Sequence, residues 1–224
     1  MKIKPVDIVV IAFSICTIFG LSLFIIYLLS SFTIIIFHDY HVVVDTGLLI
    51  LFFILFSSIF IQVMLRQFHF KAESFDMLSR RATYWKLITS VTEIGGMYFL
   101  PFVPLFLRSV FFKLFGARIG KNVEIAGKLI ELPLITIDDY AFIGGNVQIT
   151  AHAIVHDRIL LSPVNIAKKA TVGIGAIIMP GVEIGENSVV TAGAVVVMDT
   201  KIPANEMWGG IPAKNIKNLA PSDA

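Results

Sequence analysis

The chain has 224 residues, of which 56% are hydrophobic and only 15% are charged, and its mean hydropathy is +0.84. Soluble domains carry about 25% charged residues, so this composition excludes a disordered chain and argues against a purely soluble one. A net charge of +2 is too small to indicate nucleic-acid binding, and a single cysteine, Cys16, excludes a disulfide framework or a cysteine-based metal cluster.

Two apolar runs open the chain. Residues 8–37 contain no charged side chain, and residues 46–65 are also uncharged. About 20 apolar residues cross a bilayer as a helix, so residues 1–65 are predicted to form a transmembrane helical hairpin. A cleaved signal peptide is one alternative, but the first run is about twice as long as the apolar core of a signal and lacks an A-x-A site. Buried helices of a soluble core are the other alternative.

Lysine and arginine are distributed unevenly around the two runs. Lys2 and Lys4 precede the first run, and the connector 38–41 has neither residue type. Five cationic residues follow the second run: Arg66, Lys71, Arg80, Arg81 and Lys86. The positive-inside bias predicts that both termini and the C-terminal part lie in the cytoplasm, at a membrane of the bacterial inner-membrane type.

Residues 66–116 are predicted to form a juxtamembrane helical segment. Its last part, 97–115, is apolar but contains Pro101, Pro104, Arg108 and Lys113. Prolines three residues apart disfavour a straight spanning helix, whereas an apolar face with flanking cations suits a helix in the membrane interface. A helix that caps a soluble core is the alternative.

Residues 117–217 carry an aliphatic residue at nearly every sixth position. The spacing is unbroken over Ile166, Val172, Ile178, Ile184, Val190, Val196 and Ile202, and small or β-branched residues such as Ala170 and Ala176 follow four positions later. Upstream it includes Ile119, Ile125, Ile137, Ile143 and Ile149, with one interruption at Glu131. A six-residue period fits neither an α-helix nor a plain strand and is typical of a parallel β-helix. Between four and five coils of three hexads are expected over 119–202.

The motifs of this region resemble those of the hexapeptide-repeat acyltransferases. They are Ile143-Gly144-Gly145-Asn146-Val147, Met179-Pro180-Gly181-Val182-Glu183-Ile184-Gly185, Thr191-Ala192-Gly193-Ala194-Val195-Val196 and Gly209-Gly210-Ile211-Pro212-Ala213-Lys214. The resemblance implies a mainly β fold, a left-handed parallel β-helix over 117–217, here preceded by the helical hairpin and the interfacial segment and followed by a tail at 218–224. It also implies acetyl-CoA or another acyl-CoA as co-substrate, no metal, and a homotrimer with sites at its subunit interfaces.

A register slip marks the candidate site. Ile149 and Ile166 are 17 residues apart rather than 18, so a loop is expected to leave the coil between them. This loop contains His152 and His156, and an imidazole can take the proton of an attacking hydroxyl or amine near neutral pH. The resemblance makes His152, five residues after Val147, the general base of a reaction without an acyl-enzyme. His156 is the rival base, and Asp157 could orient an imidazole.

The resemblance also implies a donor site along the later coils. Its matching positions are Ile174, Gly175 and Ala192 for the pantetheine arm, with Lys214 near the nucleotide phosphates. The coil itself also requires small residues, and Lys214 can simply be solvated. Trp208 is expected to pack at the C-terminal end of the coil, whereas Glu131 has no assigned role.

Three functions therefore compete. The favoured one is a membrane-bound acyltransferase, in the first place an O-acetyltransferase, whose acceptor is a lipid-linked saccharide, a lipid or a hydrophobic natural product among the membrane lipids. A non-catalytic β-helix scaffold at the membrane is the second. The third is a zinc carbonic anhydrase, for which His152 and His156 would supply two of three ligands, although the repeat region has no third histidine.

Overall fold

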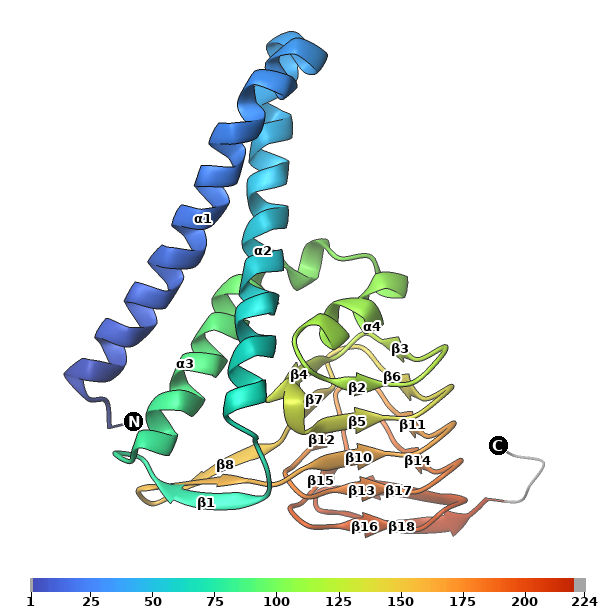
Figure 1. Ribbon diagram of the computed structural model, residues 1–224. Helices are drawn as coiled ribbons and strands as arrows, with labels where there is room; N and C mark the ends of the chain where they lie inside the picture. Colours follow the sequence, from blue (N-terminus) through green and yellow to red (C-terminus); the bar gives the residue numbers. More distant parts are fainter. Residues whose placement is uncertain (1, 220–224) are drawn as a thin grey trace. The chain divides into compact units, whose positions relative to one another are not determined.

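The computed structural model describes residues 2–219, so the expected tail lies outside the described residues from residue 220 onward. The chain forms two compact units (Figure 1). The helical unit comprises the residues up to Phe68 together with Leu78–Leu100, and the β-helix unit comprises His69–Met77 together with the residues from Pro101 onward. The expected juxtamembrane segment, 66–116, is thus divided between the two units.

The helical unit is a long hairpin with a third helix. Helices α1 (Pro5–Phe37) and α2 (His41–Gln67) are joined by the 3-10 turn η1 (His38–Tyr40), and α3 (Arg80–Gly95) is followed by the 3-10 turn η2 (Met97–Phe102). Both predicted apolar runs are therefore helical. By length and composition alone, the stretch Pro5–Gln67 could cross a membrane.

A buried polar network attaches α3 to the start of α1. The Nζ of Lys86 donates to Oδ2 of Asp7 at 2.6 Å and to the carbonyl of Lys2 at 2.9 Å. Asp7 also accepts from the hydroxyl of Thr83 at 2.7 Å and from the backbone N–H of Lys4 at 3.0 Å. The Asp7 and Lys86 side chains are 0% and 4% exposed, so these hydrogen bonds replace the water that both charges have lost.

The coil has three parallel faces whose strands stack as successive rungs (Figure 1). The first face contains β2 (Arg118–Ile119), β5 (Ile135–Ile137), β10 (Val164–Ile166), β13 (Glu183–Ile184) and β16 (Lys201–Ile202). The second contains β3 (Glu124–Ile125), β6 (Phe142–Ile143), β11 (Thr171–Val172), β14 (Val189–Val190) and β17 (Glu206–Gly210). The third contains β4 (Lys128–Ile130), β7 (Gln148–Thr150), β12 (Ile177–Ile178) and β15 (Val195–Val196).

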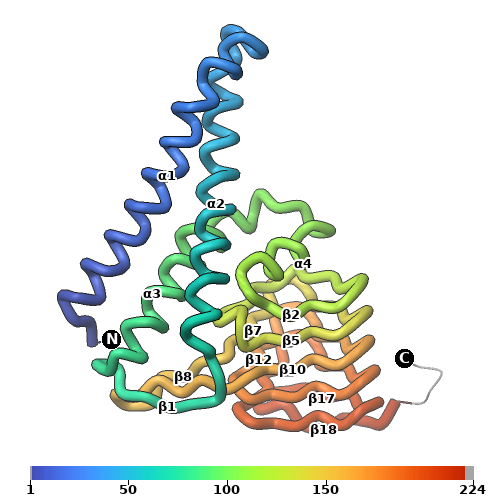
Figure 2. Tube along the Cα trace, in the orientation of Figure 1, coloured from blue at the N-terminus to red at the C-terminus, as the bar shows by residue number. Residues whose placement is uncertain are grey.

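The predicted six-residue period is confirmed by burial. Its aliphatic residues point into the coil, and each is at most 8% exposed: Ile119, Ile125, Ile137, Ile143, Ile149, Ile166, Val172, Ile178, Ile184, Val190, Val196 and Ile202. Ala170, Ala176, Val182 and Ser188 fill the positions between them at 0% exposure. The last strand, β18 (Ala213–Asn218), turns back antiparallel to β17 and ends the coil (Figure 2). Trp208 lies on β17, as expected for a residue at the C-terminal end.

The interruption of the period at Glu131 is a local rearrangement of one coil. The period would place residue 131 opposite Ile149, but Leu129 of β4 pairs with Ile149 instead. The corner between β3 and β4 is therefore two residues shorter than the equivalent corner between β6 and β7. A Cβ at Gly127 in this corner would lie 2.7 Å from the carbonyl oxygen of Val147, so the tight path requires glycine. The missing residues are restored after β4 by the 3-10 turn η3 (Leu132–Leu134), and Glu131 precedes this turn with a φ of +59°.

At the register slip a segment leaves the coil, as predicted, and the structure shows that this segment is a β-hairpin rather than a plain loop. Its strands are β8 (His152–Val155) and β9 (Arg158–Leu161), and β9 also pairs with β1 (Glu73–Asp76) to give a three-stranded antiparallel sheet. Strand β1 lies in the segment 66–116, for which the sequence predicts only helix. Its pairing partner lies more than 80 residues away, so no local pattern indicates this strand.

Helix α4 (Leu105–Leu114) caps the first coil. Phe112 and Phe115 are completely buried, and the cations that were expected to flank a membrane face instead donate to coil carbonyls, Arg108 to Ala126 at 3.3 Å and Lys113 to Gly120 at 3.4 Å. This face of α4 therefore packs as a helix that caps a core, which was the alternative to a helix in the membrane interface. Its other face exposes large apolar side chains, including Phe106 at 78%.

Candidate active site

His152 is held at the point where the hairpin leaves the coil. It begins β8 directly after Ala151, which is completely buried and whose carbonyl accepts from the backbone N–H of Ser162 at 2.9 Å. This bond closes the base of the hairpin, so the backbone of His152 is fixed on both sides. The His152 side chain is 24% exposed and can therefore meet a substrate.

A buried carboxylate contacts this histidine. Oε2 of Glu131 lies 2.6 Å from Nδ1 of His152, and the Glu131 side chain is only 5% exposed. The other oxygen, Oε1, is buried without a hydrogen-bond partner among the described residues. The left-handed backbone of Glu131 at the start of η3 aims its side chain at the next coil, so the rearranged corner is what brings the two groups together.

Thr150 completes the cluster from the end of β7. Its hydroxyl lies 3.2 Å from Nδ1 of His152 and 3.5 Å from Oε2 of Glu131, and it accepts from the backbone N–H of His152 at 3.3 Å. A carboxylate at Nδ1 favours the tautomer that carries its proton there, because an ionised carboxylate can only accept. Nε2 is then the nitrogen with the lone pair, which is the form a general base requires.

The other two predicted catalytic residues lie away from this cluster. His156 and Asp157 form the exposed turn between β8 and β9, and the carbonyl of Asp157 accepts from the backbone N–H of Met77 at 2.9 Å. Four residue steps of extended strand, about 13 Å of backbone, lead from His152 to His156. Among the described residues, no group of three or more histidine, cysteine, aspartate or glutamate side chains is placed to hold a metal ion, and a catalytic zinc needs three protein ligands.

The four predicted donor-site residues lie along one corner of the coil. The N–H of Gly193 donates to the carbonyl of Ile174 at 2.8 Å, which stacks Ala192-Gly193 on Ile174-Gly175 in successive coils. Lys214 continues the same corner, since it pairs with Gly209 on the last rung. Ile174 is 64% exposed, and Ala192 and Lys214 are also exposed.

This corner and His152 lie at opposite edges of the same face of the coil. The corner precedes β7 and β12 in the chain, whereas His152 follows β7. In the sequence, Glu131 is visible as a break in the repeat and has no assigned role. That break is the one signal that points to Glu131, but no local pattern connects it with His152, which is 21 positions away.

Comparison with known proteins identifies relatives that match part of the chain. The chain is 32% identical over 136 residues to an Escherichia coli protein named "Putative colanic acid biosynthesis acetyltransferase WcaF", covering 49% of this chain and 74% of the relative. It is 35% identical over 98 residues to gamma carbonic anhydrase 2, mitochondrial, of Arabidopsis thaliana, covering 44% of this chain and 30% of that relative. No protein-family model matches the chain.

A solved structure shares the fold. A galactoside acetyltransferase in complex with coenzyme A superposes with a TM-score of 0.51 at 22% identity, covering 73% of this chain and 92% of that chain. The chain spans between 10% and 58% of the length of the first four curated relatives that it matches.

Proposed function

The chain belongs to the hexapeptide-repeat acetyltransferases, and we propose that it transfers an acetyl group from acetyl-CoA to a hydroxyl of a membrane-associated acceptor. The observation that carries this proposal is the pairing of His152 with the buried carboxylate of Glu131 where the hairpin leaves the coil. A partly exposed imidazole with one nitrogen engaged by a carboxylate is the arrangement of a general base.

The proposed reaction proceeds in one acyl transfer without an acyl-enzyme. Nε2 of His152 takes the proton of the acceptor hydroxyl while the hydroxyl oxygen attacks the thioester carbonyl of acetyl-CoA. The C–S bond then breaks, and the imidazolium returns the proton to the departing thiolate of coenzyme A. The Glu131 carboxylate stabilises the imidazolium between these two proton transfers, as a carboxylate does in other histidine dyads.

The acetyl-CoA site is proposed along the corner that contains Ile174, Gly175, Ala192 and Lys214. A narrow pantetheine arm can run past the small residues, and the exposed ammonium of Lys214 can meet a phosphate. Since this corner and His152 flank opposite edges of one face, we propose that a neighbouring copy supplies one of the two elements to each site. A homotrimer provides three such sites.

The proposed location is an inner membrane of the bacterial type, with both termini in the cytoplasm. The hairpin exposes large apolar side chains, among them Phe13 at 72% and Tyr27 at 74%, which a bilayer would cover. The excess of lysine and arginine outside the two apolar runs supports the orientation. The exposed face of α4 around Phe106 would add an interfacial contact.

The proposed acceptor class follows from the covalent path of the chain. Strand β1, one strand removed from the β8 strand that carries His152, begins at Glu73, only six residues after α2 ends at Gln67. Six residues span at most about 21 Å, so a short covalent tether joins the sheet that contains the β8–β9 hairpin to the apolar helix. Such a tether suits an acceptor that is itself held in the membrane: a lipid-linked saccharide, a lipid or a hydrophobic natural product.

The test is thiol release from acetyl-CoA by the full-length protein in detergent, with and without a membrane-lipid extract as the acceptor pool. Release that depends on the extract and falls by about two to four orders of magnitude in His152→Ala supports the proposal. His156→Ala is the matched control and should keep activity, because His156 lies at the hairpin turn. Equal thiol release by the wild type and His152→Ala would show that His152 is not the base. If the wild type releases no thiol and His152→Ala keeps full biological activity, the protein would be a non-catalytic scaffold.

A further inference from the structure

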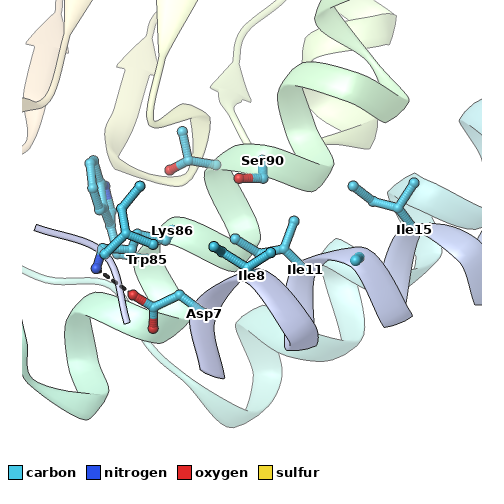
Figure 3. A pocket seen from close by; sticks show the side chains of 10 residues that line it. Asp7, Ile8, Ile11, Ile15, Trp85, Lys86 and Ser90 are labelled. Carbon is cyan, nitrogen blue, oxygen red and sulfur yellow. Dashed lines mark hydrogen bonds and ion pairs between the residues drawn. The ribbon is translucent and has the colours of Figure 1, made fainter. Parts of the chain in front are cut away.

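The helical unit contains a cleft that the proposed acetyl transfer does not use. It lies between α1 and α3 and has a volume of about 520 Å³ (Figure 3). Its α1 side is formed mainly by isoleucines, and its α3 side by an aromatic ring and two hydroxyls. The lining residues are Ile3, Asp7, Ile8, Ile11, Ala12, Ile15, Trp85, Lys86, Thr89 and Ser90.

The two ends of the cleft differ in polarity. The Asp7–Lys86 ion pair lies at one end, and Ile15 lies at the other, with Ser90 between them (Figure 3). The distance along α1 from Asp7 to Ile15 is about 12 Å, at 1.5 Å per residue. A cleft with a charged end and an aliphatic end matches the polarity of an amphiphile that lies parallel to α1.

Water is a poor occupant for the aliphatic end. The side chains of Ile11, Ala12 and Ile15 offer no hydrogen bond, and an ordered water needs at least two polar partners. An empty cleft would forfeit the dispersion contacts of its walls. On α1 the apolar surface continues outside the cleft, with Val9 exposed by 64% and Phe13 by 72%, so a chain could enter sideways from surrounding lipid.

We propose that this cleft binds one hydrocarbon chain of a membrane phospholipid, whose polar group lies toward the Asp7–Lys86 end. The proposal rests on the membrane location proposed above but is independent of acetyl transfer. The ion pair is almost fully buried and internally hydrogen-bonded, so it marks the polar end without requiring an anionic headgroup. The half-buried hydroxyls of Thr89 and Ser90 can bond to the ester groups that join a lipid chain to its head.

The test uses the full-length protein in vesicles of phosphatidylethanolamine and phosphatidylglycerol. A phosphatidylethanolamine with a photoactivatable diazirine in one acyl chain is the probe, and cross-linked peptides are identified by mass spectrometry. Labelling should concentrate on residues 8–15 and 85–90. Ala12→Phe fills the aliphatic end and should lower labelling there at least about tenfold. Val9→Phe adds similar bulk outside the cleft and should leave the labelling unchanged.

A second variant, Ser90→Leu, narrows the cleft from α3 and should reduce labelling in the same way, which guards against misfolding of either variant. Even labelling of all exposed positions on α1 and α2, or labelling unaffected by Ala12→Phe and Ser90→Leu, would overturn the proposal. Thiol release measured on the same samples separates the two proposals. If His152→Ala loses thiol release but is still labelled by the lipid probe, the lipid-binding cleft is supported independently of catalysis. If Ala12→Phe loses lipid labelling but releases thiol normally, the acetyltransferase proposal is supported independently of the cleft.

Discussion

At the scale of single residues, His152 is the proposed base, and Glu131 is expected to act through it rather than on a substrate. Its Oε2 is 2.6 Å from Nδ1, and the side chain is buried, so removal of the charge changes the imidazole and little else. Glu131→Gln should lower kcat about 10- to 100-fold and leave the KM for acetyl-CoA unchanged. Steady-state thiol release over a range of acetyl-CoA concentrations measures both parameters.

A double variant distinguishes positioning from a purely structural role. If Glu131 works through the imidazole, Glu131→Gln combined with His152→Ala should be no slower than His152→Ala alone, because the carboxylate has nothing left to orient. Glu131→Asp should recover only part of the activity, since its shorter side chain does not reach Nδ1. Independent, multiplicative losses in the double variant would contradict the assignment.

At the scale of elements, the short corner at Gly127 determines where Glu131 lies. An alanine there would place its Cβ 2.7 Å from the Val147 carbonyl oxygen and 2.9 Å from the Val147 Cβ, so the first two coils would have to separate. Gly127→Ala should destabilise the coil by about 1–3 kcal/mol and lower thiol release with it. Gly145→Ala is the matched control, because a Cβ at Gly145 has no neighbour within 4 Å. Thermal unfolding followed by circular dichroism compares the two, and equal midpoints would contradict this account.

The repetitive elements could be predicted from the sequence, and the irregular ones could not. The six-residue aliphatic period predicted the extent of the coil, because every inward-facing position has the same small space to fill. The register slip before Ile166 predicted where a segment leaves the coil. The corner at Gly127 is two residues shorter than the period requires and the turn at Glu131 is two residues longer, so the two changes cancel. Ile125 and Ile137 therefore keep the spacing of two hexads in the sequence, and the rearrangement between them is hidden. The pairing of Glu131 with His152, and of β1 with β9, depends on contacts between distant segments, which local patterns do not encode.

The attachment of α3 to α1 depends on a charge pair. Asp7→Asn removes the carboxylate that lies 2.6 Å from the buried ammonium of Lys86 and should destabilise the helical unit by about 3–5 kcal/mol. Replacing both residues, Asp7→Leu with Lys86→Met, should recover most of the loss because no isolated charge then remains. The temperature at which the detergent-solubilised protein aggregates is the measure. Equal stability of the single and double variants would show that the pair is not what fastens α3.

At the scale of the whole molecule, one chain presents the proposed base and the proposed donor corner at opposite edges of a face. In a cyclic assembly each copy offers both edges, so every complete site is shared by two neighbours. Two variants that are inactive for different reasons should then complement each other. His152→Ala removes the base, and Ala192→Trp blocks the donor corner at an exposed position.

Co-expression of these two variants in equal amounts should restore about a quarter of the wild-type thiol release, because one site in four draws both elements from intact copies. As the control, the two variants are purified separately and then mixed. This mixture should stay inactive, provided that assembled oligomers do not exchange subunits. A co-expressed pair as inactive as either variant alone would mean that each chain carries its own complete site. Restored activity would instead make the assembly, rather than the single chain, the unit that performs the reaction.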